Sequence, residues 1–318
     1  MRDRAQHRPR PSTARLAALR LWLILAMAIV FSACAETDPS SSATAISTAT
    51  PAEVATRSAE PSPPSSESPS PQPSPTEIED GVYIAIGDSV TFGIGASQPR
   101  RDGFPAVLGN LLANGDPPIS ETRVFAVPGQ TATGFLEARL DDVLVAIEEL
   151  GDRVELLTIG LGANELLRIR REPTCVADPV GVACASAVMA ATTEAAGALD
   201  AVVASVQRAL NASGSDARIL LLAYYNPDVE PIAVATVVGA DGIVACDPDD
   251  GAPGLNDRIA CVADARGVEL VDLYAAFLGR EDELTRFGVG DVHPDEAGHA
   301  VIAETIAAAF GVAPPADH

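Results

Sequence analysis

From about residue 80 onward, short apolar runs alternate with longer segments that carry a helical pattern. Strands that are apolar throughout and separated by helices are typical of a parallel sheet covered by helices on both faces. The pattern therefore predicts one doubly wound α/β domain with a five-stranded parallel sheet and no internal repeat. The expected strands are Tyr83–Ile86, Thr122–Ala126, Val154–Ile159, Arg218–Ala223 and Val268–Val271. The expected helices are Phe104–Ala113, Ala132–Leu150, Ser186–Asn211, Gly254–Ala265 and Asp295–Phe310.

We expect this domain to occupy residues 80–313, with a short tail over 314–318 and two further segments before it. Residues 1–35 combine an arginine-rich leader with an uncharged run from Leu21 to Ala35, which is typical of an export signal. A permanent membrane anchor is the alternative, but a bilayer-spanning helix needs about twenty apolar residues. Residues 36–79 are rich in Ser, Thr and Pro, which predicts a disordered linker that holds the domain away from the cell envelope.

The end of the apolar run offers two cleavage sites. Phe31–Cys34 resembles the lipobox of bacterial lipoproteins, in which the cysteine becomes the lipidated first residue, although Phe31 stands where leucine is usual. Ala33–Ala35 also fits an A-x-A site that would release a soluble protein. We favour lipidation of Cys34, because a cysteine directly after the apolar run otherwise lacks a purpose. Both interpretations predict an exported domain.

The charge of the mature chain excludes one class of partner. Beyond residue 34 the chain holds 15 arginines, no lysine and 43 acidic residues, a formal charge of about −28. Such a surface repels nucleic acid and anionic membranes. We therefore expect no nucleic-acid partner, membrane contact only through an N-terminal lipid anchor, and a monomer.

The four cysteines inside the domain are consistent with an oxidising compartment. Of three connectivities, pairing between neighbours in the sequence is the simplest, Cys175 with Cys184 and Cys246 with Cys261. A metal site is the alternative, but the chain has no Cys-x-x-Cys motif or flanking histidines.

Small and polar residues follow several of the expected strands. They lie at Gly87–Ser89, Val127–Thr131 and Gly160–Glu165, and a related stretch, Gly290–Pro294, precedes the last helix. Each stretch by itself is explained by turn formation. In a parallel sheet, however, the ligand site forms at the carboxyl ends of the strands. Four such stretches together predict a functional site at that edge.

The chain has few histidines, which limits the candidates for a catalytic base. A serine nucleophile needs a base near neutral pH, usually histidine, and the domain offers only His293 and His299. His293 precedes Pro294 in the loop that enters the last helix. His299 lies within that helix, where we expect a packed or surface residue.

These stretches, in this order, resemble the SGNH or GDSL hydrolase superfamily over the whole domain. The resemblance implies a flavodoxin-like α/β fold and an esterase or lipase-like activity that needs neither metal nor cofactor. It implies that Ser89 is the nucleophile and His293 the base. It also implies an oxyanion hole formed by the Ser89 N–H, the Gly129 N–H and the side chain of Asn164.

The chain departs from the family pattern at two positions. Glu165 follows Asn164 where the family has aspartate, which preserves the charge. The family also places an aspartate three residues before the histidine, but that residue is Gly290, and Asp291 stands two residues before His293. Either Asp291 orients the imidazole through a shifted loop, or a backbone carbonyl does so and leaves a Ser–His dyad. We favour Asp291.

Two functions remain in view. The first is an exported serine esterase that cleaves a small-molecule, glycan or lipid ester. The second is an envelope protein whose hydrolase fold has drifted into a binding role, which only the displaced acid favours. Two other features have modest roles: Asp88 is expected to bond within its own turn, and Tyr224–Pro227 either line the substrate cleft or pack in the core.

Overall fold

The computed structural model describes residues 80–115, 118–228, 230–239, 241–247 and 251–312. The predicted export signal, Cys34, the linker over 36–79 and the last residues from 313 lie outside the described residues. Within the described ranges, one five-stranded sheet has the order β2-β1-β3-β4-β5, and every pair of neighbours is parallel. The strands are β1 (Gly81–Gly87), β2 (Ile119–Ala126), β3 (Val154–Gly160), β4 (Arg218–Ala223) and β5 (Glu269–Asp272).

The predicted fold class and all five strands are confirmed. The strand order is the flavodoxin-like one, in which the chain reverses direction along the sheet between β1 and β3. Ligands bind at the carboxyl ends of strands beside such a switch point. The functional site is therefore expected where β1 and β3 end.

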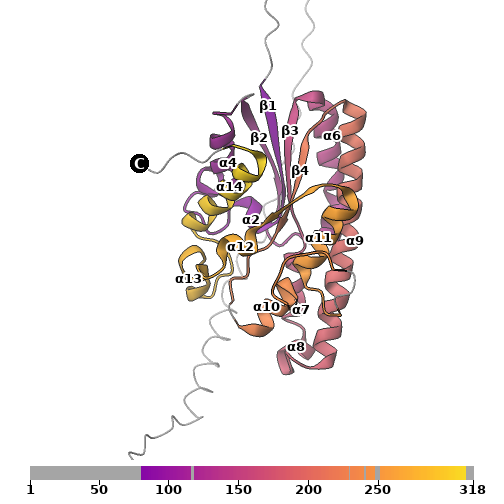
Figure 1. Ribbon diagram of the computed structural model, residues 1–318, viewed down its shortest axis with the longest axis vertical. Coiled ribbons are helices and arrows are strands. Elements are labelled where there is room, and N and C mark those ends of the chain that lie inside the picture. Colours follow the sequence, from indigo (N-terminus) through magenta and orange to yellow (C-terminus); the bar gives the residue numbers. More distant parts are fainter. Residues whose placement is uncertain (1–79, 116–117, 229, 240, 248–250, 313–318) are drawn as a thin grey trace, which may run out of the picture. The chain divides into compact units, whose positions relative to one another are not determined.

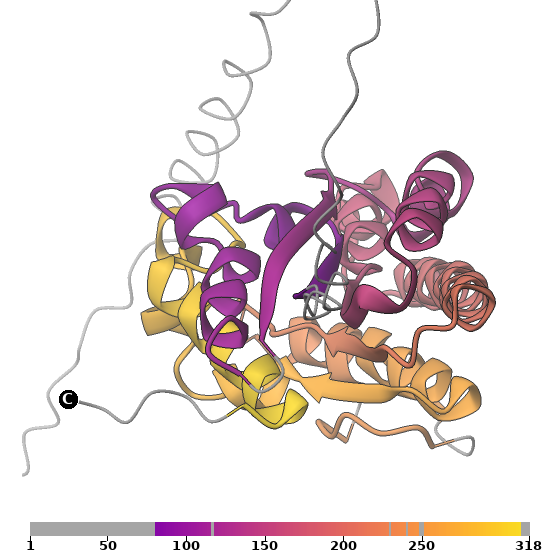
Figure 2. The same ribbon diagram turned by 90° about the horizontal axis from the view of Figure 1, so that it is seen from above.

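Side chains of β1 alternate between two cores. Val82, Ile84 and Ile86 belong to the core on one face of the sheet, and Tyr83 and Ala85 belong to the other. This alternation follows from the two-residue period of a strand. Figure 1 shows α4 and α14 on one side of the strands and α6, α9 and α11 on the other, and Figure 2 gives the same separation from above.

The long helices agree with prediction except in one place. The segment expected as one helix over Ala132–Leu150 is two helices that meet at Arg139, whose φ of −130° is not helical. The bend lets Phe135 before it and Val143 after it enter the same core. The helices that lie in the predicted helical segments are α4 (Phe104–Leu112), α5 (Ala132–Ala138), α6 (Leu140–Leu150), α9 (Val182–Ser213), α11 (Leu255–Arg266) and α14 (Glu296–Phe310).

The sequence did not predict the short helices. Most span only about one turn, which is too little for an apolar period to be read. The first turns of α3, α8 and α10 begin with proline, which is compatible with that position but also reads as a loop signal. These elements are α2 (Ser89–Phe92), α3 (Pro99–Asp102), η1 (Gly151–Arg153), α7 (Ala163–Ile169), α8 (Pro173–Ala177), α10 (Pro231–Val238), α12 (Leu273–Phe277), α13 (Glu281–Leu284) and η2 (Phe287–Val289).

Helix α9 is the one described helix that is long and apolar enough to cross a membrane by length and composition. Its 32 residues pack against α5, α6, α7 and α11. Leu199, Val202, Val203 and Val206 are buried in the core against the sheet. These contacts make α9 a core helix of the domain.

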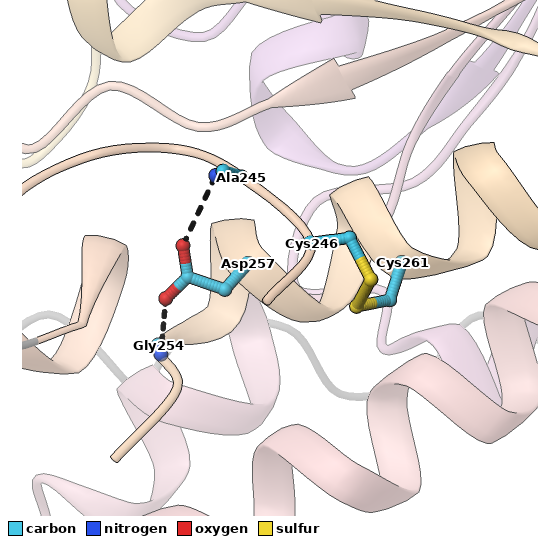
Figure 3. Close-up of a disulfide and its surroundings, with 5 residues drawn as sticks. All are labelled: Ala245, Cys246, Gly254, Asp257 and Cys261. Atoms are coloured by element: carbon cyan, nitrogen blue, oxygen red, sulfur yellow. Dashed lines mark hydrogen bonds between the residues drawn. A yellow bond between two sulfur atoms is a disulfide. The ribbon is translucent and has the colours of Figure 1, made fainter. Parts of the chain in front are cut away.

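Both predicted disulfides are present. Cys175 in α8 pairs with Cys184 in the first turn of α9, and Cys246 pairs with Cys261 of α11. Near the second bond, Asp257 accepts hydrogen bonds from the backbone N–H groups of Ala245 and Gly254 (Figure 3). The disulfide and these two bonds hold the preceding segment against α11. Two disulfides are typical of an extracellular or periplasmic protein.

Candidate active site

The register of the sheet brings three of the predicted stretches to one level. Gly87 at the end of β1 pairs with Ala126 at the end of β2 and with Gly160 at the end of β3. The loops that carry Ser89, Gly129 and Asn164 therefore all begin at the same edge.

Ser89 is the first residue of the short helix α2 and is 9% exposed. Its side chain meets the last predicted stretch, because its Oγ lies 2.8 Å from His293 Nε2 across a separation of 204 residues. His293 precedes α14, which packs on α4 and thereby holds the histidine loop beside α2. Asp295 caps α14 by accepting the N–H of Gly298.

Asp291 contacts His293 despite its displaced position in the sequence. Its Oδ1 lies 2.5 Å from His293 Nδ1 and 3.2 Å from the backbone N of His293. An aspartate that accepts the N–H two residues ahead forms an Asx turn, which folds the carboxylate back over the following residues. Gly290, with a φ of 81°, supplies the left-handed backbone conformation that starts this turn.

The second oxygen of Asp291 is also engaged. Arg286 Nε lies 3.1 Å from Asp291 Oδ2, and the backbone N–H of Arg286 donates to the backbone carbonyl of His293. These contacts fix the carboxylate on the Nδ1 side of the ring. A donor at Nδ1 leaves Nε2 as the acceptor for the Ser89 hydroxyl.

Asn164 lies in the first turn of α7 and is 9% exposed. Its Nδ2 donates to the Gln130 carbonyl at 2.9 Å and to Asp88 Oδ2 at 3.2 Å. Gln130 follows Gly129, so the loop after β2 touches Asn164. Gly129 is exposed with a φ of 80°, and its N–H donates to no acceptor in the described part of the chain.

Asp88 does more than its predicted turn contact. Its Oδ1 accepts the N–H of Val90 as expected, but its Oδ2 also accepts the hydroxyl of Tyr224 at 2.9 Å and the amide of Asn164. Burial raises the pKa of Asp88 from its ordinary 3.8 to about 6, and the bonds from Val90 and Tyr224 and the proximity of His293 oppose this rise. Only one signal in the sequence pointed to Tyr224, namely its position directly after β4.

Glu165, which replaces the aspartate of the family pattern, is buried beside Asn164. Its Oε1 accepts the N–H of Ala132 at 2.7 Å and so ties α7 to the start of α5. Its Oε2 has no hydrogen-bond partner among the described residues. Burial raises the pKa of Glu165, and backbone hydrogen bonds oppose the rise. The contacts are structural and leave Asn164 facing the site.

His299 is fully buried on α14 and lies outside this constellation. Its Nδ1 accepts the N–H of Phe104, and its Nε2 donates to the Ile94 carbonyl at 3.0 Å. Burial lowers the pKa of His299, which keeps the ring neutral. The sequence-based expectation was a packed or a surface residue of the helix, and the structure gives the packed one.

A pocket opens beside Ser89 and His293. Ser89, His293 and Asn164 contribute polar groups to its lining, as do Arg170 at the end of α7 and Thr236 of α10. Apolar side chains of α7, α10 and the first residue of α11 form much of the rest. Tyr224–Pro227 line the pocket, as one of the two sequence-based interpretations expected. Its apolar walls are Ala163, Leu166, Leu167, Ala233, Val237 and Leu255.

Comparison with known proteins gives one family match. Residues 85–301 match the model of the GDSL-like lipase/acylhydrolase family. A stretch of 105 residues is 35% identical to UDP-N-acetylenolpyruvoylglucosamine reductase from Paramagnetospirillum magneticum, over 33% of this chain. That match spans 34% of the length of the reductase, so it gives no statement about the reaction of this chain.

Several solved structures share the fold. The lipase Lip_vut3 from a goat rumen metagenome is 20% identical, with a TM-score of 0.55 over 73% of this chain and 98% of its own. Acetylxylan esterase Axe2 from Geobacillus stearothermophilus is 18% identical, with a TM-score of 0.51 over 73% and 94%. Phospholipase A1 from Streptomyces albidoflavus is 21% identical, with a TM-score of 0.50 over 72% and 99%. At these identities the likeness is one of fold.

Proposed function

Because the chain belongs to the GDSL-like lipase/acylhydrolase family, its reaction class is the hydrolysis of carboxylic esters, and we propose that Ser89 is the nucleophile and His293 its base. The observation that carries this proposal is the 2.8 Å contact between Ser89 Oγ and His293 Nε2. The short contact between His293 Nδ1 and Asp291 supports Asp291 as the orienting acid.

The steps follow from these contacts. Ser89 Oγ attacks the ester carbonyl while its proton passes to His293 Nε2, and the Asp291 carboxylate stabilises the imidazolium that results. The tetrahedral oxyanion accepts hydrogen bonds from the N–H groups of Ser89 and Gly129 and from the amide of Asn164. Collapse breaks the carbon–oxygen bond, and the imidazolium returns its proton to the leaving alcohol. Water then cleaves the acyl-enzyme by the same sequence and frees Ser89.

We infer from the lining of the pocket where the acyl chain binds. Its apolar residues on α7, α10 and α11 would receive the chain of an ester whose carbonyl lies at Ser89. Apolar walls stabilise an acyl chain and offer few partners to a sugar hydroxyl. The structural neighbours include lipolytic enzymes and an acetylxylan esterase, so the fold itself does not choose among esters. We propose an ester with an acyl chain of several carbons, carried by a small molecule, glycan or lipid.

The proposal includes an exported enzyme. The two disulfides support an extracellular or periplasmic site of action. The arginine-rich leader and Cys34 support a lipid-anchored form, with residues 36–79 as the linker and a soluble secreted form as the alternative. The competing binding function drew only on the displaced acid, and the contact between Asp291 and His293 supports hydrolysis instead.

The test is hydrolysis of p-nitrophenyl acetate, butyrate and octanoate by the purified protein and by Ser89→Ala. We expect turnover that is strongest on butyrate or octanoate and falls at least a thousandfold in Ser89→Ala, because loss of a serine nucleophile can cost about 10⁶ in kcat. Ser205→Ala, on helix α9 away from the pocket, is the matched control and should retain full activity. Turnover that survives in Ser89→Ala would contradict the assignment.

A further inference from the structure

The amide of Asn164 is held from two sides in the unliganded site. Its Nδ2 carries two hydrogens, and both have acceptors: the Gln130 carbonyl at 2.9 Å and Asp88 Oδ2 at 3.2 Å. Asp88 Oδ2 in turn accepts the hydroxyl of Tyr224 at 2.9 Å. The three side chains are buried, with exposed fractions of 2% for Asp88, 8% for Tyr224 and 9% for Asn164.

Tyr224 itself is fixed by a second buried residue. Asn256, at the start of α11 and fully buried, accepts the Tyr224 N–H at 2.8 Å and donates to the Tyr224 carbonyl at 2.7 Å. This two-way clamp sets the backbone from which the Tyr224 ring projects. A continuous path of hydrogen bonds therefore runs from α11 through the end of β4 to Asp88 and Asn164.

We propose that Tyr224 and Asp88 are positioning residues, which together hold the Asn164 amide in the orientation that the oxyanion needs. When Asn164 turns toward the oxyanion, Tyr224 keeps the Asp88 carboxylate hydrogen-bonded. The inference rests on the proposed function, in which Asn164 is an oxyanion donor. Neither residue needs to touch the reacting carbonyl for this role.

The physical reason lies in the freedom of an amide group. The terminal torsion of asparagine has broad minima, so an unsupported Asn164 would lose preorganisation before the oxyanion forms. Of its two bonds, the one to Asp88 is the longer and hence the easier to redirect. When Asn164 turns its hydrogen to the oxyanion, the Tyr224 hydroxyl and the Val90 N–H still satisfy the buried Asp88 carboxylate. Without Tyr224 that step would leave Oδ2 buried and unpaired, which is costly.

Tyr224→Phe tests this role, because it removes one hydroxyl and keeps the ring that lines the pocket. We expect kcat on p-nitrophenyl butyrate to fall about tenfold, as for loss of one supporting hydrogen bond to a charged group, with KM within about twofold. Tyr83→Phe is the matched control. Its hydroxyl bonds Thr158 at 2.8 Å in the opposite core, so it should lose comparable stability and keep kcat.

A double-mutant cycle separates positioning from general destabilisation. If Tyr224 acts through Asn164, adding Tyr224→Phe to Asn164→Ala should lower kcat by less than about twofold further. Asp88→Asn is the second variant and needs no change at Tyr224. If the new side-chain oxygen keeps the hydrogen bond from Val90, the new NH₂ group of residue 88 faces the NH₂ group of Asn164. Two donors then oppose each other, so kcat should fall more than in Tyr224→Phe.

Three results would overturn the inference. Tyr224→Phe with the same kcat as Tyr83→Phe would do so, and so would a full tenfold loss in the Asn164→Ala background. Both leave hydrolysis dependent on Ser89 and hence leave the proposed function standing. Absence of Ser89-dependent hydrolysis in the unchanged protein would instead remove the proposed function and this inference together.

Discussion

The Asp291 carboxylate lies 2.5 Å from His293 Nδ1 although a single residue separates the two in the chain. One oxygen serves both the ring and the backbone N–H of His293, and Arg286 engages the other. The proposed acid and the proposed base thus share one tight turn. A displacement of one position relative to the family pattern changes the local backbone and still delivers a carboxylate to the imidazole.

Asp291→Asn should lower kcat by a factor of about 10² to 10³ with little change in KM. Loss of the orienting acid in serine hydrolases costs up to about 10⁴, and Asp291 is partly exposed, so water can replace part of its effect. Steady-state kinetics on p-nitrophenyl butyrate measures this. Asp295→Asn is the matched control, since asparagine also caps a helix well. A rate within twofold of the unchanged protein would favour a Ser–His dyad.

Gly129→Ala should lower kcat about tenfold or more, because it strains the loop that offers an oxyanion donor. A Cβ at Gly129 meets no atom within 4 Å, so the effect would come from its φ of 80°. Gly267→Ala provides the comparison: its φ is 64°, it is equally free of contacts, and it ends α11 away from the pocket. Both variants should lose about 1 kcal/mol of unfolding free energy, but only Gly129→Ala should lose activity. Equal activity in the two would exclude Gly129 from the site.

Ala233→Phe should shorten the preferred acyl chain. Ala233 is buried on α10 and lines the pocket, where a phenyl ring would occupy the space for a chain. We expect kcat/KM on p-nitrophenyl octanoate to fall about tenfold or more, while that on the acetate changes by less than threefold. Ala235→Phe, exposed on the same helix, should leave the profile unchanged. A parallel loss on acetate and octanoate would mean that the chain binds elsewhere.

The stability of the domain should depend on Asp88 at mildly acidic pH. Burial raises its pKa to about 6, so the folded protein binds this proton more tightly than the unfolded chain does. The contribution of Asp88 to the unfolding free energy is therefore most favourable below about pH 4 and declines as the pH rises through 6, by about 3 kcal/mol in total. Urea denaturation between pH 4 and 7 should reveal this slope in the difference between the unchanged protein and Asp88→Asn. Asp141→Asn, exposed on α6, controls for the loss of one charge, and a flat difference would contradict the prediction.

The predictable part of this molecule is the part governed by short-range patterning. The strand Arg218–Ala223 has the predicted bounds, because an apolar run between polar turns specifies both ends. The stretches that hold Ser89, Asn164 and His293 could be found because each follows a strand or precedes a helix and is rich in small and polar residues, whereas the roles of the three residues came from the resemblance to a known family. Helix α10 could not be predicted from the sequence, because it depends on packing over the pocket and because its proline is also a loop signal.

Contacts between residues far apart in the sequence limit what could be predicted. The bond from Tyr224 to Asp88 joins residues 136 positions apart, and no feature of either local sequence specifies it. Whether Asp291 would reach His293 depended on the φ of Gly290, since a glycine adopts either sign of φ. In both cases the missing information was three-dimensional: which strand ends meet, and which way a flexible residue turns.

If Ser89 and His293 act as proposed, the contact between them also sets when this domain becomes active during its synthesis. The serine follows the first strand and the histidine precedes the last helix, so a growing chain that already contains most of the sheet still lacks its base. On this assignment hydrolysis requires α14 to have docked on α4, so catalytic turnover would be a direct readout of completed folding of the domain.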